Sequence, residues 1–231
     1  MSVTIKKGNI FTTNAQTIVN TVNCVGVMGA GIALECRLRF PEMFESYKKH
    51  CQSGLLRPGK LSIFRSKDLW ILNFPTKDHW KAPSKIEYLE GGLEKFVQTY
   101  TQLRIESIAF PLLGADRGGI PTGKSEAIIL QYLDPLELPV ELYHYDPHST
   151  DDLFENFRKW FLSGGETILR DHYGIRNNIL IKISNAILGG QVCQLNQLGR
   201  IKGIGIKSLE IVFHAARSEM QNDHAPSGLD F

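Results

Sequence analysis

The sequence predicts an α/β domain followed by a smaller, wholly helical region. Up to about residue 146, short apolar runs with the character of strands alternate with longer segments whose apolar residues recur at helical spacing. Beyond the polar stretch 146–152, only helical patterns remain. A chain of 231 residues, 42% hydrophobic and 22% charged, has the size and composition for two such globular parts. We expect a domain at 1–147, a helical domain at 151–220 and a flexible tail at 221–231.

Six apolar runs predict six strands in the first part. Each run either alternates apolar with polar residues or is continuously apolar over the length of a strand. The runs are Val3–Lys7, Ala15–Val22, Lys60–Phe64, Leu69–Phe74, Ser107–Leu112 and Val140–Tyr145.

Helical spacing predicts four helices between these strands and five helices after them. Pro41 suits the first position of a helix, and Ser84 with Glu87 three residues later has the spacing of a capping box. In the first part, the helices are predicted at Ala30–Phe40, Pro41–Cys51, Ser84–Leu103 and Gly123–Leu133. In the second part, they are predicted at Leu153–Leu162, Glu166–Tyr173, Asn177–Leu188, Gln194–Ile201 and Lys207–Met220.

Targeting signals and metal-binding spacings are missing from the sequence. No apolar run approaches the roughly 20 residues that span a bilayer, and residues 1–8 lack the apolar core of a signal peptide. The cysteines have neither the paired spacing of a zinc site nor that of a disulfide framework; they are Cys24, Cys36, Cys51 and Cys193. We therefore expect a cytoplasmic protein that needs no membrane, metal or cofactor.

An asparagine followed by a glycine-rich loop is the most informative feature of the first part. The run Ala15–Val22 delivers Asn23 to a loop with glycines at 26, 29 and 31, which enters a predicted helix. Glycine lets backbone amides approach a ligand closely, and free N–H groups at a helix start complete an anion cradle. The spacing is not the G-x-G-x-x-G of dinucleotide-binding folds, and Leu61–Phe64 has no acidic residue. The loop favours a diphosphate ligand, with a plain tight turn as the alternative.

A second glycine-rich loop, 113–120, follows the strand predicted at Ser107–Leu112, so that two loops can close on one diphosphate. Residues 118–125 also match the nucleotide-binding pattern G-x-x-x-x-G-K-[ST], in which Lys124 would contact phosphates and Ser125 a magnesium ion. We reject that reading because residues 113–117 separate the pattern from its strand and Pro121 lacks a backbone donor. A helix that opens at residues 122–123 is the simpler explanation.

Together these motifs resemble the macrodomain family, which binds ADP-ribose. The resemblance covers about residues 1–146 and rests on Gly8–Ile10, Val19–Asn23, Gly26–Ala33 and Pro111–Gly119, in the family's order. It implies a mixed six-stranded sheet sandwiched by helices. The ligand-binding residues that it implies are Asn9, Ile10, Gly26, Val27, Met28, Gly29, Gly31, Ile32, Leu113, Gly114, Ala115, Asp116, Arg117, Gly118 and Gly119.

Two of these positions depart from the family's pattern. Many macrodomains place an aspartate where Asn9 stands, so Asn9 would offer adenine a weaker, uncharged acceptor. The family's second loop usually has a small residue where Asp116 stands. A carboxylate facing a diphosphate would repel it, so Asp116 points away, pairs with Arg117 or acts as an acid near C1″. These alternatives stay open.

Lys77 is the candidate catalytic residue, because Phe74–Trp80 resembles the matching segment of the DarG branch of macrodomains. That branch includes antitoxins that remove ADP-ribose from DNA thymidines, and a related protein glycohydrolase branch also has Thr-Lys here. The resemblance implies that Lys77, its pKa lowered by burial, attacks a ring-opened C1″ aldehyde, while Asn23 holds the distal ribose. His79 and Trp80 would form a lip against the nucleobase. The alternatives are that Lys77 is an ordinary surface lysine, that Asn23 caps a turn, and that His79 and Trp80 only cover a loop.

Positive charge is concentrated near the C-terminus. The chain has a net charge of +2, but Arg170–Arg217 alone contains seven basic and two acidic residues, or +5. Within it, 195–207 resembles a helix-hairpin-helix element, which would bind DNA phosphates through Lys202, Lys207 and the turn at Gly203 and Gly205. A solvated αα-hairpin is the alternative.

The function expected from the sequence is a DNA ADP-ribosyl glycohydrolase, with ADP-ribosylated DNA as substrate, ADP-ribose as product and a cognate ADP-ribosyltransferase toxin as partner. The alternatives are a hydrolase of ADP-ribosylated protein or of an ADP-ribose ester, and a non-catalytic ADP-ribose-binding module. The nucleobase and the oligomeric state stay open.

Overall fold

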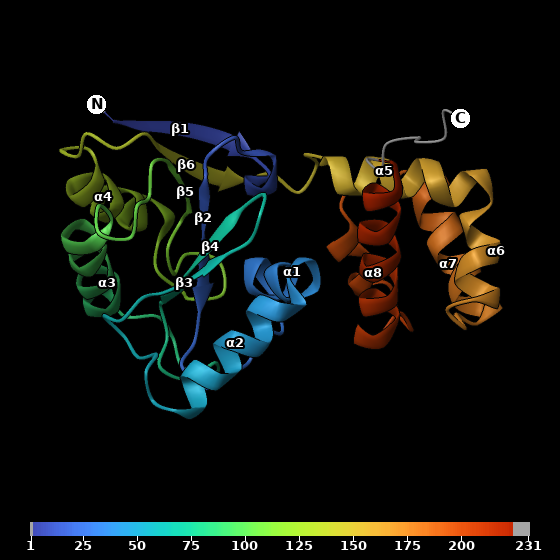
Figure 1. Cartoon of the computed structure of the whole chain (residues 1–231), viewed down its shortest axis with the longest axis horizontal. Coiled ribbons are helices and arrows are strands. Elements are labelled where there is room, and N and C mark those ends of the chain that lie inside the picture. Colours follow the sequence, from blue (N-terminus) through green and yellow to red (C-terminus); the bar gives the residue numbers. More distant parts are fainter. Residues whose placement is uncertain (1, 224–231) are drawn as a thin grey trace, which may run out of the picture. The chain divides into compact units, whose positions relative to one another are not determined.

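The computed structural model describes residues 2–223. It divides into two compact units, residues 1–146 and 147–231, which are treated separately below (Figure 1).

The N-terminal unit is built on a six-stranded mixed sheet. Its strands have the order β1-β6-β5-β2-β4-β3. Neighbouring strands are parallel, except that β3 is antiparallel to β4. The bounds are Val3–Gly8 (β1), Thr17–Val22 (β2), Ser62–Arg65 (β3), Trp70–Pro75 (β4), Ile108–Pro111 (β5) and Val140–Tyr145 (β6). The predicted six strands and the mixed sheet are confirmed.

Two helices cover each face of this sheet (Figure 1). Helices α1 (Gly31–Arg39) and α2 (Pro41–Gln52) cover one face, and α3 (Ile86–Thr99) and α4 (Thr122–Leu133) cover the other. Successive strand residues point to opposite faces. Ile18 of β2 accordingly packs with the α1–α2 side and Val19 with the α3–α4 side. This alternation explains why the central strands read as continuous apolar runs.

The start of α3 corrects one prediction. Lys85, not Ser84, is the N-cap residue, and it forms no side-chain capping bond. Ser84 is instead buried, and its backbone N–H donates to the carbonyl of Gly118 at 2.9 Å. A long-range backbone bond therefore replaces the predicted capping box. Pro41, by contrast, opens α2 as predicted.

The C-terminal unit is helical throughout its described part. Asp151 caps the first helix by accepting the N–H of Phe154 at 2.9 Å, and the interior is built from large apolar side chains such as Phe157 and Phe213. The elements are α5 (Asp152–Trp160), the π-helical turn η2 (Phe161–Gly165), α6 (Glu166–Asp171), α7 (Asn177–Leu188), the 3₁₀ helix η3 (Leu195–Arg200) and α8 (Ile206–Asp223).

The end of α8 changes the predicted tail. Residues 221–223 are helical rather than part of a flexible tail, and residues 224–231 lie outside the described chain. Within residues 2–223, no helix is long and apolar enough to cross a membrane.

Candidate active site

Asn23 organises the first glycine-rich loop with its own side chain. Its Oδ1 accepts the backbone N–H groups of Val25 at 3.1 Å and Val27 at 3.4 Å. Its Nδ2 donates to the carbonyl of Val27 at 2.5 Å. The amide thus closes the turn that follows β2. The second N–H of Nδ2 takes no part in these bonds and can meet a ligand.

Tyr47 of α2 fixes the position of Asn23 through its hydroxyl. The tyrosine is fully buried, and its hydroxyl lies 2.8 Å from the backbone carbonyl oxygen of Asn23 and 3.1 Å from its Oδ1. Burial raises the pKa of Tyr47 above its usual value, so the hydroxyl stays neutral and can donate. Twenty-four residues separate the pair, and no local motif in the sequence reveals it.

The rest of the first loop has the geometry of an anion cradle. Gly26 and Gly31 have φ values of +79° and +56°, which side chains rarely adopt. Helix α1 begins at Gly31, and Ala30 before it supplies no side-chain cap, so the helix start is open to a ligand. Of the other predicted ligands here, Met28 is buried, Ile32 is half-buried, and Val27 and Gly29 are exposed.

The neighbouring thiol does not compete as a nucleophile. Cys24 follows Asn23 and is half-buried, with its sulfur 3.4 Å from the Lys77 carbonyl. Burial raises the pKa of the Cys24 thiol to about 12. The group is therefore a neutral thiol, which is a poor nucleophile.

The second loop folds back tightly on the segment that precedes α3. A Cβ on Gly118 would lie 2.2 Å from the Gly114 carbonyl oxygen and 2.3 Å from Ser84 Oγ. Gly114 and Gly119 have φ values of +65° and +80°. Leu113, Gly114 and Gly118 are buried, Ala115 is half-buried, and Asp116, Arg117 and Gly119 are exposed. Only glycine at 118 permits this loop to form as it does.

Asp116 and Arg117 lie at the exposed tip of this loop. The guanidinium Nε of Arg117 is 3.8 Å from a carboxylate oxygen of Asp116, and both side chains are more than three-quarters exposed. Of the three roles left open for Asp116, this structure contains the pairing with Arg117. A pair this exposed contributes little to stability.

Lys77 joins the ends of the strands to the second loop. Its backbone N–H lies 3.4 Å from the Val22 carbonyl, beside Asn23, and its ammonium donates to the Arg117 carbonyl at 2.6 Å. The strands β2 and β4 are parallel neighbours, so Asn23 and Lys77 leave the same edge of the sheet. The structure thus brings together both glycine-rich loops and both predicted catalytic residues. The side chain of Lys77 is half-buried.

His79 and Trp80 lie just after Lys77 and are exposed. Their rings are stacked, with centroids 5.8 Å apart and planes inclined by 25°. Lys81 Nζ lies 5.1 Å from the centre of the Trp80 ring. An exposed aromatic pair beside a lysine is a surface on which a base can stack.

At the carboxyl end of β1, Asn9 and Ile10 are buried rather than open to solvent. Asn9 caps the short 3₁₀ helix η1 (Ile10–Thr12) by accepting the N–H of Phe11 at 3.1 Å. The guanidinium of Arg39 covers the ring of Phe11 at 4.3 Å. These contacts fix the chain where the adenine was predicted.

The rejected nucleotide-binding pattern is built differently from a phosphate-binding loop. The hydroxyl of Ser125 is buried and donates to the Leu113 carbonyl at 2.8 Å. The N–H groups of Lys124 and Ser125 both donate to the Pro121 carbonyl. These groups close the first turn of α4 instead of facing a phosphate.

In the C-terminal unit, the segment predicted to bind DNA forms the turn between η3 and α8. Lys202, Gly203, Gly205 and Lys207 are all exposed there. Gly203 has a φ of +96°. Lys182 of α7, which the sequence pattern did not single out, donates to the Lys202 carbonyl at 2.6 Å. Lys182 adds a positive charge at the turn from a distant part of the sequence.

Comparisons with known proteins agree with this geometry. The Macro domain family matches residues 19–129. The DNA ADP-ribosyl glycohydrolase of Thermus aquaticus is 41% identical over 145 residues, which are 61% of this chain and 40% of the relative. A transferase–glycohydrolase fusion protein of Thermosipho africanus is 33% identical over 161 residues, covering 62% of this chain and 42% of that protein. The chain spans about two fifths of the length of these curated relatives.

A solved structure gives the same result for the fold. The macrodomain of Mycobacterium tuberculosis DarG matches with a TM-score of 0.59 and 38% sequence identity. The match covers 61% of this chain and 96% of that macrodomain. This chain therefore belongs to the Macro domain family, through an N-terminal unit similar to the macrodomains of DarG proteins.

Proposed function

We propose that the chain is a DNA ADP-ribosyl glycohydrolase, which releases ADP-ribose from a modified nucleobase. One observation carries the proposal: the Lys77 ammonium is held 2.6 Å from the Arg117 carbonyl, between the strand end that bears Asn23 and the second glycine-rich loop. The name of the Thermus aquaticus relative supports this choice of reaction.

The reaction follows from a lysine placed at the distal ribose. The neutral form of Lys77 attacks C1″, the bond from C1″ to the base breaks, and the base takes up the proton that Nζ releases. Opening of the ribose ring converts this adduct into a Schiff base between Nζ and C1″. Water then adds to C1″, Nζ leaves as the free amine, and the ring closes again to give ADP-ribose. The net change is hydrolysis of one glycosidic bond. No step requires a metal or a redox partner.

The structure limits what Asn23 can contribute to this reaction. Its Oδ1 already accepts two backbone N–H groups and faces the Tyr47 hydroxyl, whereas one N–H of Nδ2 is left over. Asn23 therefore acts toward the substrate as a donor. It orients a hydroxyl oxygen of the distal ribose and so fixes the face of C1″ presented to Lys77.

The proposed function is tested by offering ADP-ribosylated single-stranded DNA and ADP-ribosylated protein to the whole chain. Release of ADP-ribose from DNA, faster than from protein, is expected. Faster release from protein would favour a protein hydrolase. ADP-ribose binding without release from either would favour a binding module.

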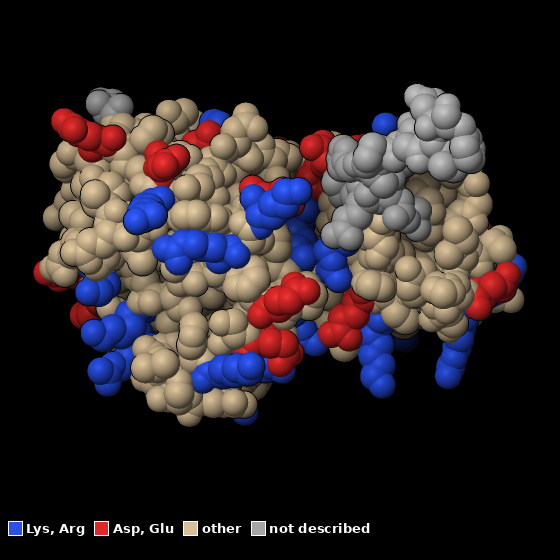
Figure 2. All heavy atoms as spheres, viewed as in Figure 1, with Lys and Arg blue, Asp and Glu red and all other residues tan. Residues whose placement is uncertain are grey.

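We further propose that the C-terminal unit binds DNA phosphates. Lys202, Lys207 and Lys182 place three cations around the turn before α8, which is an 18-residue helix. Figure 2 shows Lys and Arg side chains projecting along the lower edge of this unit. The start of a long helix and adjacent lysines together attract phosphate. The hairpin resemblance noted in the sequence supports the same choice.

A DNA ADP-ribosyltransferase is the proposed partner, and a DNA substrate implies a cytoplasmic site of action. The fusion of transferase and glycohydrolase in the Thermosipho africanus relative supports this pairing. Cells that produce such a transferase are expected to survive when they also produce this chain and to die when it carries Lys77→Ala. Equal survival with both forms would mean that protection does not depend on hydrolysis.

A further inference from the structure

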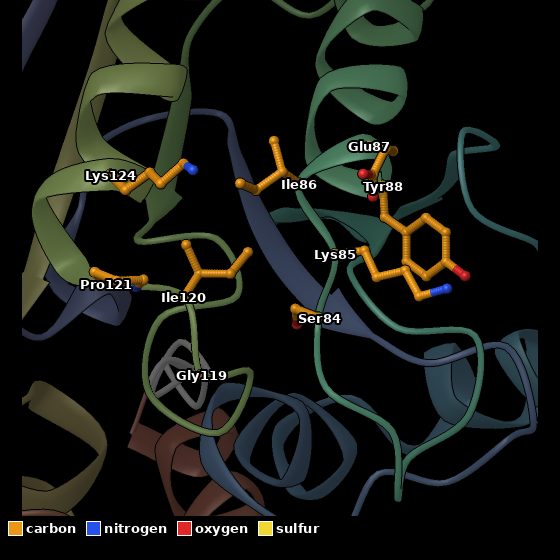
Figure 3. A pocket seen from close by; sticks show the side chains of 9 residues that line it. All are labelled: Ser84, Lys85, Ile86, Glu87, Tyr88, Gly119, Ile120, Pro121 and Lys124. Atoms are coloured by element: carbon orange, nitrogen blue, oxygen red, sulfur yellow. The ribbon is translucent and has the colours of Figure 1, made fainter.

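A depression of about 850 Å³ lies between the starts of α3 and α4, beside the end of the second loop (Figure 3). Its lining consists of Ser84, Lys85, Ile86, Glu87, Tyr88, Gly119, Ile120, Pro121 and Lys124. None of the residues predicted for catalysis lines it, and Gly119 is the one predicted ADP-ribose ligand that does.

The depression combines an apolar floor with cations. Ile86, Ile120 and Pro121 supply apolar surface. The exposed Lys124 extends from α4 toward Ile86 (Figure 3). Across the depression, Lys85 Nζ lies 5.4 Å from the centre of the half-buried Tyr88 ring.

Charge at this place favours an anion. Lys85 and Lys124 oppose a single acid in the lining, Glu87. Helices α3 and α4 both begin here, and neither start is capped by a side chain. The partial positive charges of two helix starts therefore add to the two ammonium groups. Aromatic and apolar surface beside cations suits a base with its phosphate, whereas a purely apolar partner would leave both lysines unused.

The position of the depression relative to Lys77 indicates which anion binds there. Arg117 holds the Lys77 ammonium through its carbonyl, and Gly119, two residues later, lines the depression. The Gly118 carbonyl between them accepts the N–H of Ser84, which also lines the depression. A polymer whose modified unit sits at Lys77 continues past this loop on either side. The depression is an adjoining surface whose apolar, aromatic and cationic groups suit a nucleotide.

We propose that this depression binds the nucleotide next to the modified one in a single DNA strand, with Lys85 and Lys124 on its phosphates and Tyr88 against its base. The inference rests on the proposed function, because it concerns the same substrate. It adds that the N-terminal unit itself recognises DNA, independently of the C-terminal unit.

The test compares two substrates that differ only in flanking DNA. One is an ADP-ribosylated nucleoside, and the other is a single-stranded oligonucleotide with the same modified nucleoside in its middle. The double variant Lys85→Gln/Lys124→Gln of the whole chain is expected to keep wild-type kcat/KM on the nucleoside and to lose activity on the oligonucleotide. Because two phosphate contacts are removed, the slope of log kcat/KM on the oligonucleotide against log salt concentration becomes shallower by roughly 1.4. Between roughly 50 and 200 mM salt, the wild type therefore loses about sevenfold more of its activity on the oligonucleotide than the variant does.

A matched control is Lys49→Gln/Lys67→Gln, which removes two exposed lysines of the same unit outside the depression. The proposal is overturned if both double variants lose equal activity on the oligonucleotide, or if Lys85→Gln/Lys124→Gln loses equal activity on both substrates. Selective loss on ADP-ribosylated protein instead would assign the depression to an acidic peptide. A wild-type chain that releases nothing from either DNA substrate would refute the proposed function and this inference with it.

Discussion

The hydroxyl of Tyr47 on α2 lies 2.8 Å from the carbonyl oxygen of Asn23, the residue that leads from β2 into the first glycine-rich loop. Because Tyr47 is fully buried under that loop, it transmits the position of α2 to the residue proposed to orient the distal ribose. Packing between α2 and the sheet thus determines the geometry of the site. This relationship leads to the first prediction.

Tyr47→Phe is expected to lower kcat by about tenfold with a smaller change in KM, because misplacing Asn23 affects orientation more than binding. Loss of the hydrogen bond should also lower the free energy of unfolding by about 1 kcal/mol. Steady-state kinetics and urea unfolding measure the two effects. Tyr100→Phe is the control, since the Tyr100 hydroxyl has no hydrogen-bond partner within residues 2–223. Unchanged kcat in Tyr47→Phe would remove any positioning role.

Lys77→Ala is expected to abolish release of ADP-ribose from DNA while ADP-ribose affinity, measured by calorimetry, stays within about threefold of wild type. The two glycine-rich loops that hold the diphosphate remain intact, which preserves binding. Lys81→Ala, four residues away on the exposed loop, should change turnover much less. Unchanged turnover in Lys77→Ala would exclude lysine chemistry at this position.

Lys77→Arg separates a nucleophile from a charge partner. Arginine keeps the positive charge and can donate to the Arg117 carbonyl, but its guanidinium stays protonated and cannot attack C1″. The variant should therefore be as inactive as Lys77→Ala. In the wild type, borohydride added during turnover should leave a reduced ADP-ribose adduct on Lys77 that mass spectrometry detects. Substantial activity in Lys77→Arg would show that charge alone suffices.

The sequence predicts the sheet and the loops of this fold well for a physical reason. Strands buried on both faces are continuous apolar runs, and the turns between them need glycine, so both leave local signals such as Val19–Asn23 and Gly26. Ser84 shows where local signals fail. Its spacing to Glu87 matches a capping box, but the Gly118 carbonyl, 34 residues away in sequence, takes its N–H instead. The roles of Tyr47 and Lys182 could not be predicted from local sequence for the same reason, since each side chain contacts a residue 20 or more positions away.

Gly118→Ala is expected to weaken ADP-ribose binding and to lower the free energy of unfolding by about 1–3 kcal/mol. The new Cβ would meet the Gly114 carbonyl oxygen at 2.2 Å, and backbone on that side cannot move without opening the second loop. Gly123→Ala is the matched control, because nothing lies within 4 Å of its Cβ position. Calorimetry and thermal unfolding compare the two. Equal affinity in both variants would show that the tight loop is not needed for the ligand.

The turn before α8 offers a test of DNA binding by the C-terminal unit that distinguishes charge from backbone approach. Lys182→Ala removes the ammonium that contacts the Lys202 carbonyl, and should weaken binding to DNA of any sequence and flatten its salt dependence by about 0.7–0.9. Gly205→Val removes no charge and fills space that is open in the free protein. It should therefore leave stability nearly unchanged yet impair binding, because the new side chain stands between the turn and a phosphate.

Lys159→Ala, on the exposed part of α5, is the control for loss of one charge. Fluorescence anisotropy with unmodified single- and double-stranded oligonucleotides across a salt series measures all four forms of the whole chain. If Lys182→Ala and Gly205→Val both bind as wild type does, the turn is a packing element and the DNA surface lies elsewhere.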